Sequence, residues 1–150
     1  MHLTSHSPKE TRKIASNLAK RLKGGEVLCL FGDLGGGKTT FIQGLAKGLG
    51  VKKNVTSPSF VLMRKYPISD HLVTSLYHID CYRVKSYKEI LDIGFNEILE
   101  DKNAIVAIEW ADKIKEILPE KRLDIRFKFE DDKVRKIDFK TKGAKHQNLF

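Results

Sequence analysis

Residues Gly32–Thr39 have the sequence Gly-Asp-Leu-Gly-Gly-Gly-Lys-Thr, which matches the spacing G-x-x-x-x-G-K-[ST] of a phosphate-binding loop. Glycines let the backbone curl until successive N–H groups point at one anion, and a helix that begins after the loop adds its unpaired amides. Lys38 would reach the outer phosphates as a point charge, and the Thr39 hydroxyl suits Mg²⁺, which prefers oxygen ligands. We therefore predict that ATP and Mg²⁺ bind here. The residues expected to hold the nucleotide are Asp33, Leu34, Gly35, Gly36, Gly37, Lys38, Thr39 and Thr40.

Two acidic residues follow apolar runs at positions that suit catalysis. Hydrolysis of a bound triphosphate needs a carboxylate near Mg²⁺ and a group that positions water. Asp80 follows the run Leu72–Ile79, and Glu109 follows the run Ala104–Ile108. The carboxyl ends of strands line the ligand crevice of an open α/β sheet, so both acids are expected beside the loop. Each could instead be a solvated loop residue or a helix cap. We predict that Asp80, Glu109 and Lys38 form the catalytic group.

The surrounding elements are those that would position such a site. Glu26–Phe31 is a short apolar run between glycines, as expected for a strand buried on both faces of a parallel sheet. The helix Lys38–Leu49 follows the loop directly. The other predicted elements are a helix from Pro8 with a capping box of Ser7 and Glu10, strands at 60–66, 72–79, 104–108, 123–129 and 135–139, and short helices at 86–91, 96–100 and 112–118. Turn residues join two of the strand pairs into hairpins. The predicted fold class is α/β: a P-loop NTPase-like three-layer fold with a mixed, mainly parallel central sheet and added antiparallel hairpins.

The composition is that of one globular domain. The chain has 150 residues, a formal net charge of +9 and lysines scattered along its length, a balance compatible with nucleic acid, a phosphorylated ligand or an acidic protein. It has no apolar run long enough to span a membrane and no signal peptide, so we expect a cytoplasmic protein without membrane contact. Cys29 and Cys81 lack metal-ligand spacing and are predicted to be buried free thiols. We expect one domain over residues 1–140 and a frayed, basic polar tail over 141–150.

Four separated motifs, taken in order, resemble the TsaE (YjeE) family, the small ATPase of bacterial tRNA threonylcarbamoyladenosine biosynthesis. They are G-D-L-G-G-G-K-T-T at Gly32–Thr40, T-S-P-S-F at Thr56–Phe60, H-I-D-C-Y-R at His78–Arg83 and I-E-W at Ile108–Trp110. The resemblance implies that Thr39 and Glu109 serve Mg²⁺ and that Asp80 orients the attacking water or orders a switch. It also implies that Thr56–Phe60 is the mobile switch segment and that Thr11 lies near the adenine.

The resemblance further implies a weak, partner-stimulated, Mg²⁺-dependent ATPase. Its turnover would support threonylcarbamoyl transfer to the adenosine next to the tRNA anticodon. The transferase chemistry would lie on a TsaD-like subunit, and a TsaB-like subunit would be a second partner. The tRNA is a possible further partner, either indirectly or through the basic charge, which could equally aid docking to an acidic partner. The alternatives are a P-loop small-molecule kinase, with Asp80 as the base for a substrate hydroxyl, and a nucleotide-dependent binding module without relevant turnover. The absence of N-K-x-D and L-S-G-G-Q argues against a GTPase and a transporter-type ATPase.

Overall fold

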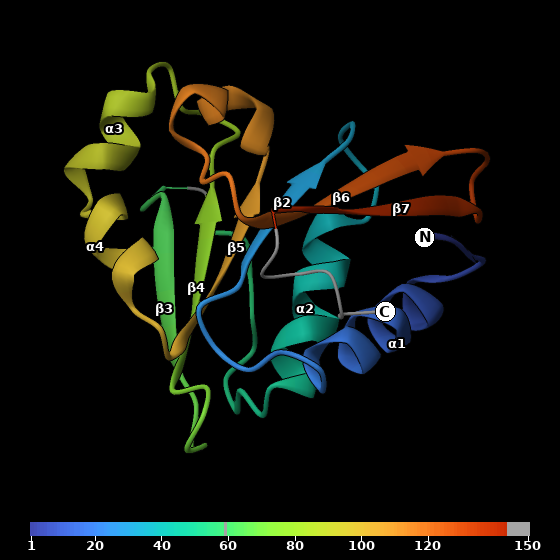
Figure 1. Ribbon diagram of the computed structural model, residues 1–150. Coiled ribbons are helices and arrows are strands. Elements are labelled where there is room, and N and C mark those ends of the chain that lie inside the picture. The colour runs from blue at the N-terminus through green and yellow to red at the C-terminus, as the bar shows by residue number, and fades with distance from the viewer. Residues whose placement is uncertain (59, 144–150) are drawn as a thin grey trace.

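The computed structural model describes residues 1–58 and 60–143, and within them one seven-stranded sheet runs in the order β1-β7-β6-β2-β5-β4-β3. Neighbours among β6, β2, β5 and β4 pair in parallel, whereas β3, β7 and β1 each pair antiparallel at the edges. This arrangement confirms the predicted mixed, mainly parallel sheet with added hairpins (Figure 1). The strands are β1 (His2–Ser5), β2 (Val27–Phe31), β3 (Met63–Pro67), β4 (Ser75–Asp80), β5 (Ala104–Glu109), β6 (Arg122–Phe129) and β7 (Arg135–Lys142).

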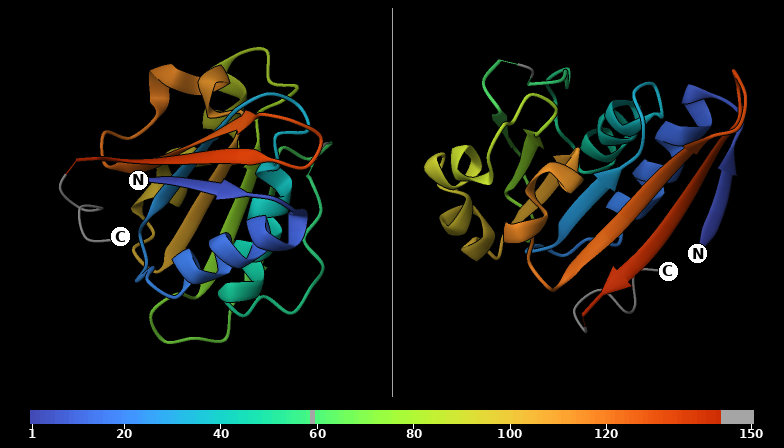
Figure 2. Two further views of the ribbon diagram at one scale, coloured as in Figure 1. Left: turned by 90° about the vertical axis from the view of Figure 1, so that its right-hand side faces the viewer. Right: turned by 90° about the horizontal axis from the view of Figure 1, so that it is seen from above.

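Helices form the outer two of the three layers. α1 (Pro8–Ala19) and α2 (Lys38–Gly48) pack on one face of the sheet. On the other face lie α3 (Tyr87–Asp92), α4 (Phe95–Glu100) and the 3-10 helix η1 (Ala111–Ile117) (Figures 1 and 2). The central strands β2 and β5 contribute apolar side chains to both cores, but β6 and β7 contribute only to the core beneath α1 and α2. The predicted three-layer fold is therefore confirmed, with one layer covering only part of the sheet.

Helix caps follow the expected chemistry with one correction. The Ser7 hydroxyl accepts a hydrogen bond from the Glu10 N–H at 3.1 Å, and Pro8 begins α1, as predicted. The predicted reciprocal bond of the capping box is wrong, because the Glu10 carboxylate accepts from the His6 N–H at 2.7 Å. A complete capping box is present at α3 instead, between Ser86 and Glu89.

Several element boundaries differ from the prediction. β1 was not predicted, since four residues with a mixed polar pattern carry little strand signal until β7 supplies a partner. β3 starts at Met63 rather than residue 60, and β4 starts at Ser75 rather than residue 72. β7 continues to Lys142 rather than ending at residue 139, and so includes the first two residues of the predicted tail. Residues 144–150 of the predicted tail lie outside the described residues.

Both cysteines are buried and free, as predicted. Burial raises the pKa of Cys81 to about 12, and burial together with the nearby Asp124 carboxylate raises the pKa of Cys29 further still. Both side chains are therefore neutral thiols at physiological pH. Among residues 1–58 and 60–143, no helix is long and apolar enough to cross a bilayer.

The helices α1 and α2 approach each other closely at Gly44, and this contact provides a stability test. A Cβ atom there would lie 2.4 Å from the Arg12 carbonyl oxygen and 2.5 Å from its Cα, both rigid backbone atoms. We expect Gly44→Ala to lower the free energy of unfolding by about 1–3 kcal/mol, despite its better helix propensity, because the helices must separate. Urea unfolding measures this, with Asn17→Ala at an exposed position of α1 as the control without a clash. A Gly44→Ala protein as stable as that control would contradict the packing.

Candidate functional site

The glycine-rich loop joins the end of β2 to the start of α2 and forms one wall of a cavity of about 410 Å³. Gly35 and Gly37 have φ angles of +76° and +99°, a region that side chains with a Cβ rarely adopt, so the curled backbone depends on glycine. The structure brings the predicted loop residues Leu34–Thr40 together with both predicted acids at this cavity, whereas Asp33 lies outside it. The cavity is lined by Leu34, Gly35, Gly36, Gly37, Lys38, Thr39, Thr40, Ser57, Asp80, Tyr82, Arg83, Glu109 and Trp110.

Lys38 is folded back inside the loop. Its ammonium group donates to the carbonyl oxygens of Gly32 at 2.5 Å and Asp33 at 2.8 Å, and lies 4.0 Å from the centre of the Trp110 ring. Burial lowers its pKa from the usual 10.5, although the carboxylates of Glu109 and Asp33 partly oppose this shift. A cation that is desolvated and satisfied only by carbonyls and an aromatic face is well prepared to exchange those partners for phosphate oxygens.

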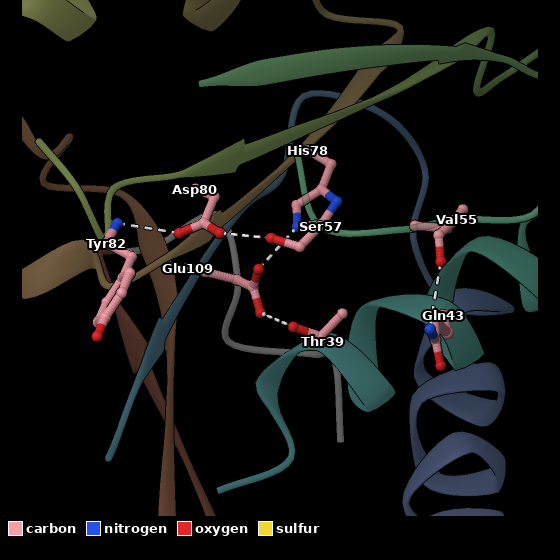
Figure 3. Close-up of polar contacts among 8 residues, drawn as sticks. All are labelled: Thr39, Gln43, Val55, Ser57, His78, Asp80, Tyr82 and Glu109. Atoms are coloured by element: carbon pink, nitrogen blue, oxygen red, sulfur yellow. Dashed lines mark hydrogen bonds and ion pairs between the residues drawn. The ribbon is translucent and has the colours of Figure 1, made fainter. Parts of the chain in front are cut away.

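Glu109 connects the loop to the sheet. One of its carboxylate oxygens accepts the Thr39 hydroxyl at 2.7 Å, and the other lies 3.0 Å from His78 Nε2 (Figure 3). Glu109 is only 2% exposed and His78 is fully buried. With the carboxylate ionised, His78 donates from Nε2, and its Nδ1 has no hydrogen-bond partner among the described residues. The carboxylate is therefore held from two sides in one orientation.

Asp80 lies directly beside Glu109, because the last residues of β4 and β5 are paired in register. Its carboxylate accepts the Ser57 hydroxyl at 2.6 Å and the Tyr82 N–H at 2.9 Å (Figure 3). Ser57 belongs to the segment that follows α2, and this segment is also held where the Gln43 side chain donates to the Val55 carbonyl at 3.2 Å. The Asp80 carboxylate thus links the segment after α2 to the carboxyl end of β4.

Trp110 closes the cavity next to Glu109. It adopts φ +55°, an uncommon conformation for a non-glycine residue, and such conformations cluster at functional sites. This turn directs the indole toward Lys38 and toward Tyr82, whose ring centre lies 5.0 Å away. The turn also ends β5 at Glu109 and starts η1 at Ala111.

Two predicted nucleotide contacts lie outside the main cavity. Asp33 is exposed and lines a separate hollow of about 270 Å³ on the other side of the loop. Thr11 is buried in α1, where its hydroxyl is hydrogen-bonded to that of Ser5 at 2.8 Å. It lines a smaller cavity of about 100 Å³ that also touches Gly35, Gly37 and Thr40 from the side of α1. The adenine contact of Thr11 remains a prediction.

The oxygen atoms at the site fit a shared magnesium ion rather than a self-contained metal centre. Within residues 1–58 and 60–143, no group of three or more His, Cys, Asp or Glu side chains is arranged to hold a metal. The Thr39 hydroxyl and the Glu109 carboxylate are in contact below the loop. Mg²⁺ is typically bound by one or two such ligands together with substrate phosphates and water. The donor set is consistent with an ion that arrives with a nucleotide.

The sequence alone assigns no individual role to five residues that the structure places at the site: Ser57, His78, Tyr82, Arg83 and Trp110. Each lies in one of the motifs that carry the family resemblance, and Ser57 lies in the predicted switch segment Thr56–Phe60. Alternation along β4 places His78 on the same face as Asp80, and this pattern is a further signal for His78.

The fold and the site define the class of protein: a three-layer α/β protein of the P-loop NTPase type. Residues 5–137 match the family model described as "Threonylcarbamoyl adenosine biosynthesis protein TsaE". The chain is 41% identical over 143 residues to the tRNA threonylcarbamoyladenosine biosynthesis protein TsaE of Bacillus subtilis, covering 95% of this chain and 87% of that one. It is 38% identical over 120 residues to the protein of the same name from Treponema pallidum, covering 80% and 85% of the two chains. The chain belongs to the TsaE family.

Structural comparison agrees with this assignment. The crystal structure of Bacillus subtilis YdiB superposes with a TM-score of 0.75 at 35% sequence identity. The match covers 99% of this chain and 90% of the YdiB chain. The similarity of fold therefore extends over both helical layers and the whole sheet.

Proposed function

We propose that this chain is the accessory ATPase subunit of a tRNA threonylcarbamoyladenosine biosynthesis machinery, with the transferase chemistry on a partner subunit. The family model and the relatives reported above carry names that place them in threonylcarbamoyladenosine biosynthesis. The observation that carries the ATPase part is the contact between the Thr39 hydroxyl and the Glu109 carboxylate directly below the glycine-rich loop. This contact connects the start of α2, whose amides would bind the phosphates, to Glu109 at the carboxyl end of β5.

The loop would hold the triphosphate. Lys38 would leave the Gly32 and Asp33 carbonyls and contact the outer phosphates, while the amides at the start of α2 bind the same charge. Thr39 and Glu109 would hold Mg²⁺, which supplies charge neutralisation at the phosphates when bound. His78 keeps the Glu109 carboxylate oriented while the nucleotide enters.

Asp80 would orient the attacking water. Its carboxylate lies at the cavity beside Glu109 and can accept a proton from a water held between the strand ends and the phosphates. In the present arrangement one of its oxygens is occupied by Ser57. Release of that hydroxyl would therefore couple movement of the segment after α2 to the arrival of the water.

The rim of the cavity supports stimulation by partners. Leu34 is 75% exposed and Tyr82 is 47% exposed, although both line the cavity. Water reaches the phosphates freely across such a rim, and electrostatic catalysis is weaker in a wet site. A TsaD-like or TsaB-like subunit that covers these side chains would exclude water and raise the rate.

The test is ATP hydrolysis by the full chain alone, then with TsaD-like and TsaB-like subunits, and then with tRNA as well. We expect slow release of free phosphate that rises when the partner subunits are present. Transfer of the γ-phosphate to a metabolite would instead support a small-molecule kinase. Full support of tRNA modification by Asp80→Ala and Glu109→Ala variants would support a nucleotide-dependent binding module. Failure to bind ATP with Mg²⁺ would remove the proposal.

A further inference from the structure

The outer face of β7, β1 and the second half of β6 lies open in the described part of the protein, whereas Asp124 near the start of β6 is buried. The apolar side chains of β6 and β7 point into the core beneath α1 and α2, except for Phe129 at the end of β6, which is exposed and lies against Arg135. The helices of the opposite layer gather over β2, β5 and β4, and Figure 2 shows none of them over β7 or β1. A central sheet of this kind is usually covered on both faces, so the composition of the uncovered part is informative.

This open face is dominated by cations. Because side chains alternate along a strand, the outward positions of β6 and β7 are the residues between their buried apolar ones. The outward cations are Arg122, Arg126, Lys128, Lys136, Lys140 and Lys142, and the outward acids are Asp124 and Asp138. We call this set the basic sheet face. Its outward positions carry no Phe, Tyr or Trp.

The two acids of the basic sheet face already have partners. Asp124 is buried and accepts from Arg122 Nε at 2.8 Å. Asp138 contacts the His2 ring, and this hydrogen bond is the main cause that lowers the pKa of the Asp138 carboxyl. By contrast, Lys128 and Lys140 are exposed and form no ion pair or hydrogen bond through their side chains among the described residues. The face therefore presents uncompensated positive charge.

The strand register places like charges opposite each other. Lys128 is the Cα partner of Lys136, and Arg122 is the Cα partner of Lys142. Directly opposed like charges on one face of an antiparallel pair are destabilising. The Lys136 side chain turns toward Glu130, which relieves part of the first repulsion. A polyanion that lies across the two strands would relieve the rest.

We propose that the basic sheet face binds the sugar-phosphate backbone of RNA, specifically the tRNA on which the machinery acts. The choice of tRNA rests on the proposed function, whereas the charge of the face does not. A protein partner would need an apolar core at its interface, and no outward position of β6 or β7 offers an apolar anchor. Lysine and arginine side chains alone are sufficient for phosphate contacts. Binding is then tolerant of base sequence and strongly dependent on salt.

The basic sheet face also lies near the nucleotide site. Arg126, 4.6 Å from the Phe31 ring centre, lines the hollow that includes Gly32 and Asp33 on the side of the loop away from the main cavity. RNA bound to the basic sheet face would therefore reach the hollow beside the phosphate-binding loop, but it would not occupy the nucleotide cavity. Nucleotide and RNA would bind the same chain at once.

The experiment titrates the full chain into a fluorescently labelled tRNA transcript and follows anisotropy from 50 to 200 mM KCl. We compare Lys128→Gln/Lys140→Gln with Lys13→Gln/Lys20→Gln, which removes the same charge from exposed positions on the α1 side. The first variant is expected to bind roughly tenfold or more weakly at about 0.1 M salt, with a salt slope smaller by about 1–2 units. The control is expected to bind like the parent chain. Equal weakening of both variants, or no tRNA binding by the parent chain, would overturn the proposal.

Two further measurements separate RNA from other polyanions and from the ATPase proposal. Labelled polyglutamate and vesicles with anionic phospholipid are titrated in the same buffers. Binding of either at tRNA-like affinity, with the same loss in Lys128→Gln/Lys140→Gln, would overturn RNA as the ligand. ATP binding with Mg²⁺ is measured separately, and we expect it to be unchanged in both double variants. Failure of ATP binding in the parent chain would count against the proposed function and not against the basic sheet face.

Discussion

Glu109→Gln is expected to reduce partner-stimulated ATP hydrolysis by at least about a hundredfold, comparable to the loss of other fixed electrostatic contacts at active sites. The substitution removes the charge and keeps the shape. The Thr39 hydroxyl can still donate to the amide oxygen, and the amide nitrogen can donate to His78 Nε2 in the tautomer that carries its hydrogen on Nδ1. The site therefore stays folded but lacks the carboxylate proposed to hold Mg²⁺. Phosphate release in the presence of the partner subunits is the measurement.

Glu26 provides a matched control because it is also a buried glutamate, 5% exposed, but lies at the opposite end of the sheet. It stands just before β2, where its two oxygens accept from the N–H groups of Lys23 at 3.0 Å and Gly24 at 2.8 Å. Glu26→Gln keeps one acceptor oxygen and should cost about 1 kcal/mol of stability without changing hydrolysis. An equal loss of hydrolysis in the two variants would show that Glu109 acts through general stability.

The part of the site that could be predicted from sequence is the part that depends on local geometry. Gly35 and Gly37 needed positive φ angles, and the apolar runs on either side fixed a strand, a loop and a helix in that order. Asp80 and Glu109 could be placed because the ends of parallel strands meet at one edge of a sheet. This placement of the two acids holds whichever strands are neighbours in the sheet.

The rest depended on contacts between distant segments. His78 becomes part of the site only because β4 and β5 are adjacent and in register, which single-strand periodicity does not reveal. β1 exists because β7 offers an edge, and the open face of β6 and β7 follows from how far α3, α4 and η1 extend across the sheet. The basic composition was visible in the sequence, whereas its concentration on one face required the register of the strands.

Lys38→Met is expected to weaken ATP binding by about tenfold to a hundredfold, because charge-assisted hydrogen bonds to phosphate are each worth about 1.5–3 kcal/mol. The effect on folding should be smaller than that on binding. In the free protein the Lys38 ammonium group satisfies two carbonyls, but burial already disfavours its charged form and lowers its pKa. Methionine removes the two bonds and the desolvation cost together, so we expect the free energy of unfolding to change by no more than about 1 kcal/mol.

Calorimetric titration with a non-hydrolysable ATP analogue and Mg²⁺ measures the affinity, and urea unfolding of the same samples measures stability. Lys47→Met is the control, since Lys47 lies in the last turn of the same helix and is exposed. It removes an equal charge far from the loop and should leave binding unchanged. If Lys38→Met binds the analogue as tightly as Lys47→Met does, the triphosphate is not held at the glycine-rich loop, and the nucleotide must be sought at another surface of the chain.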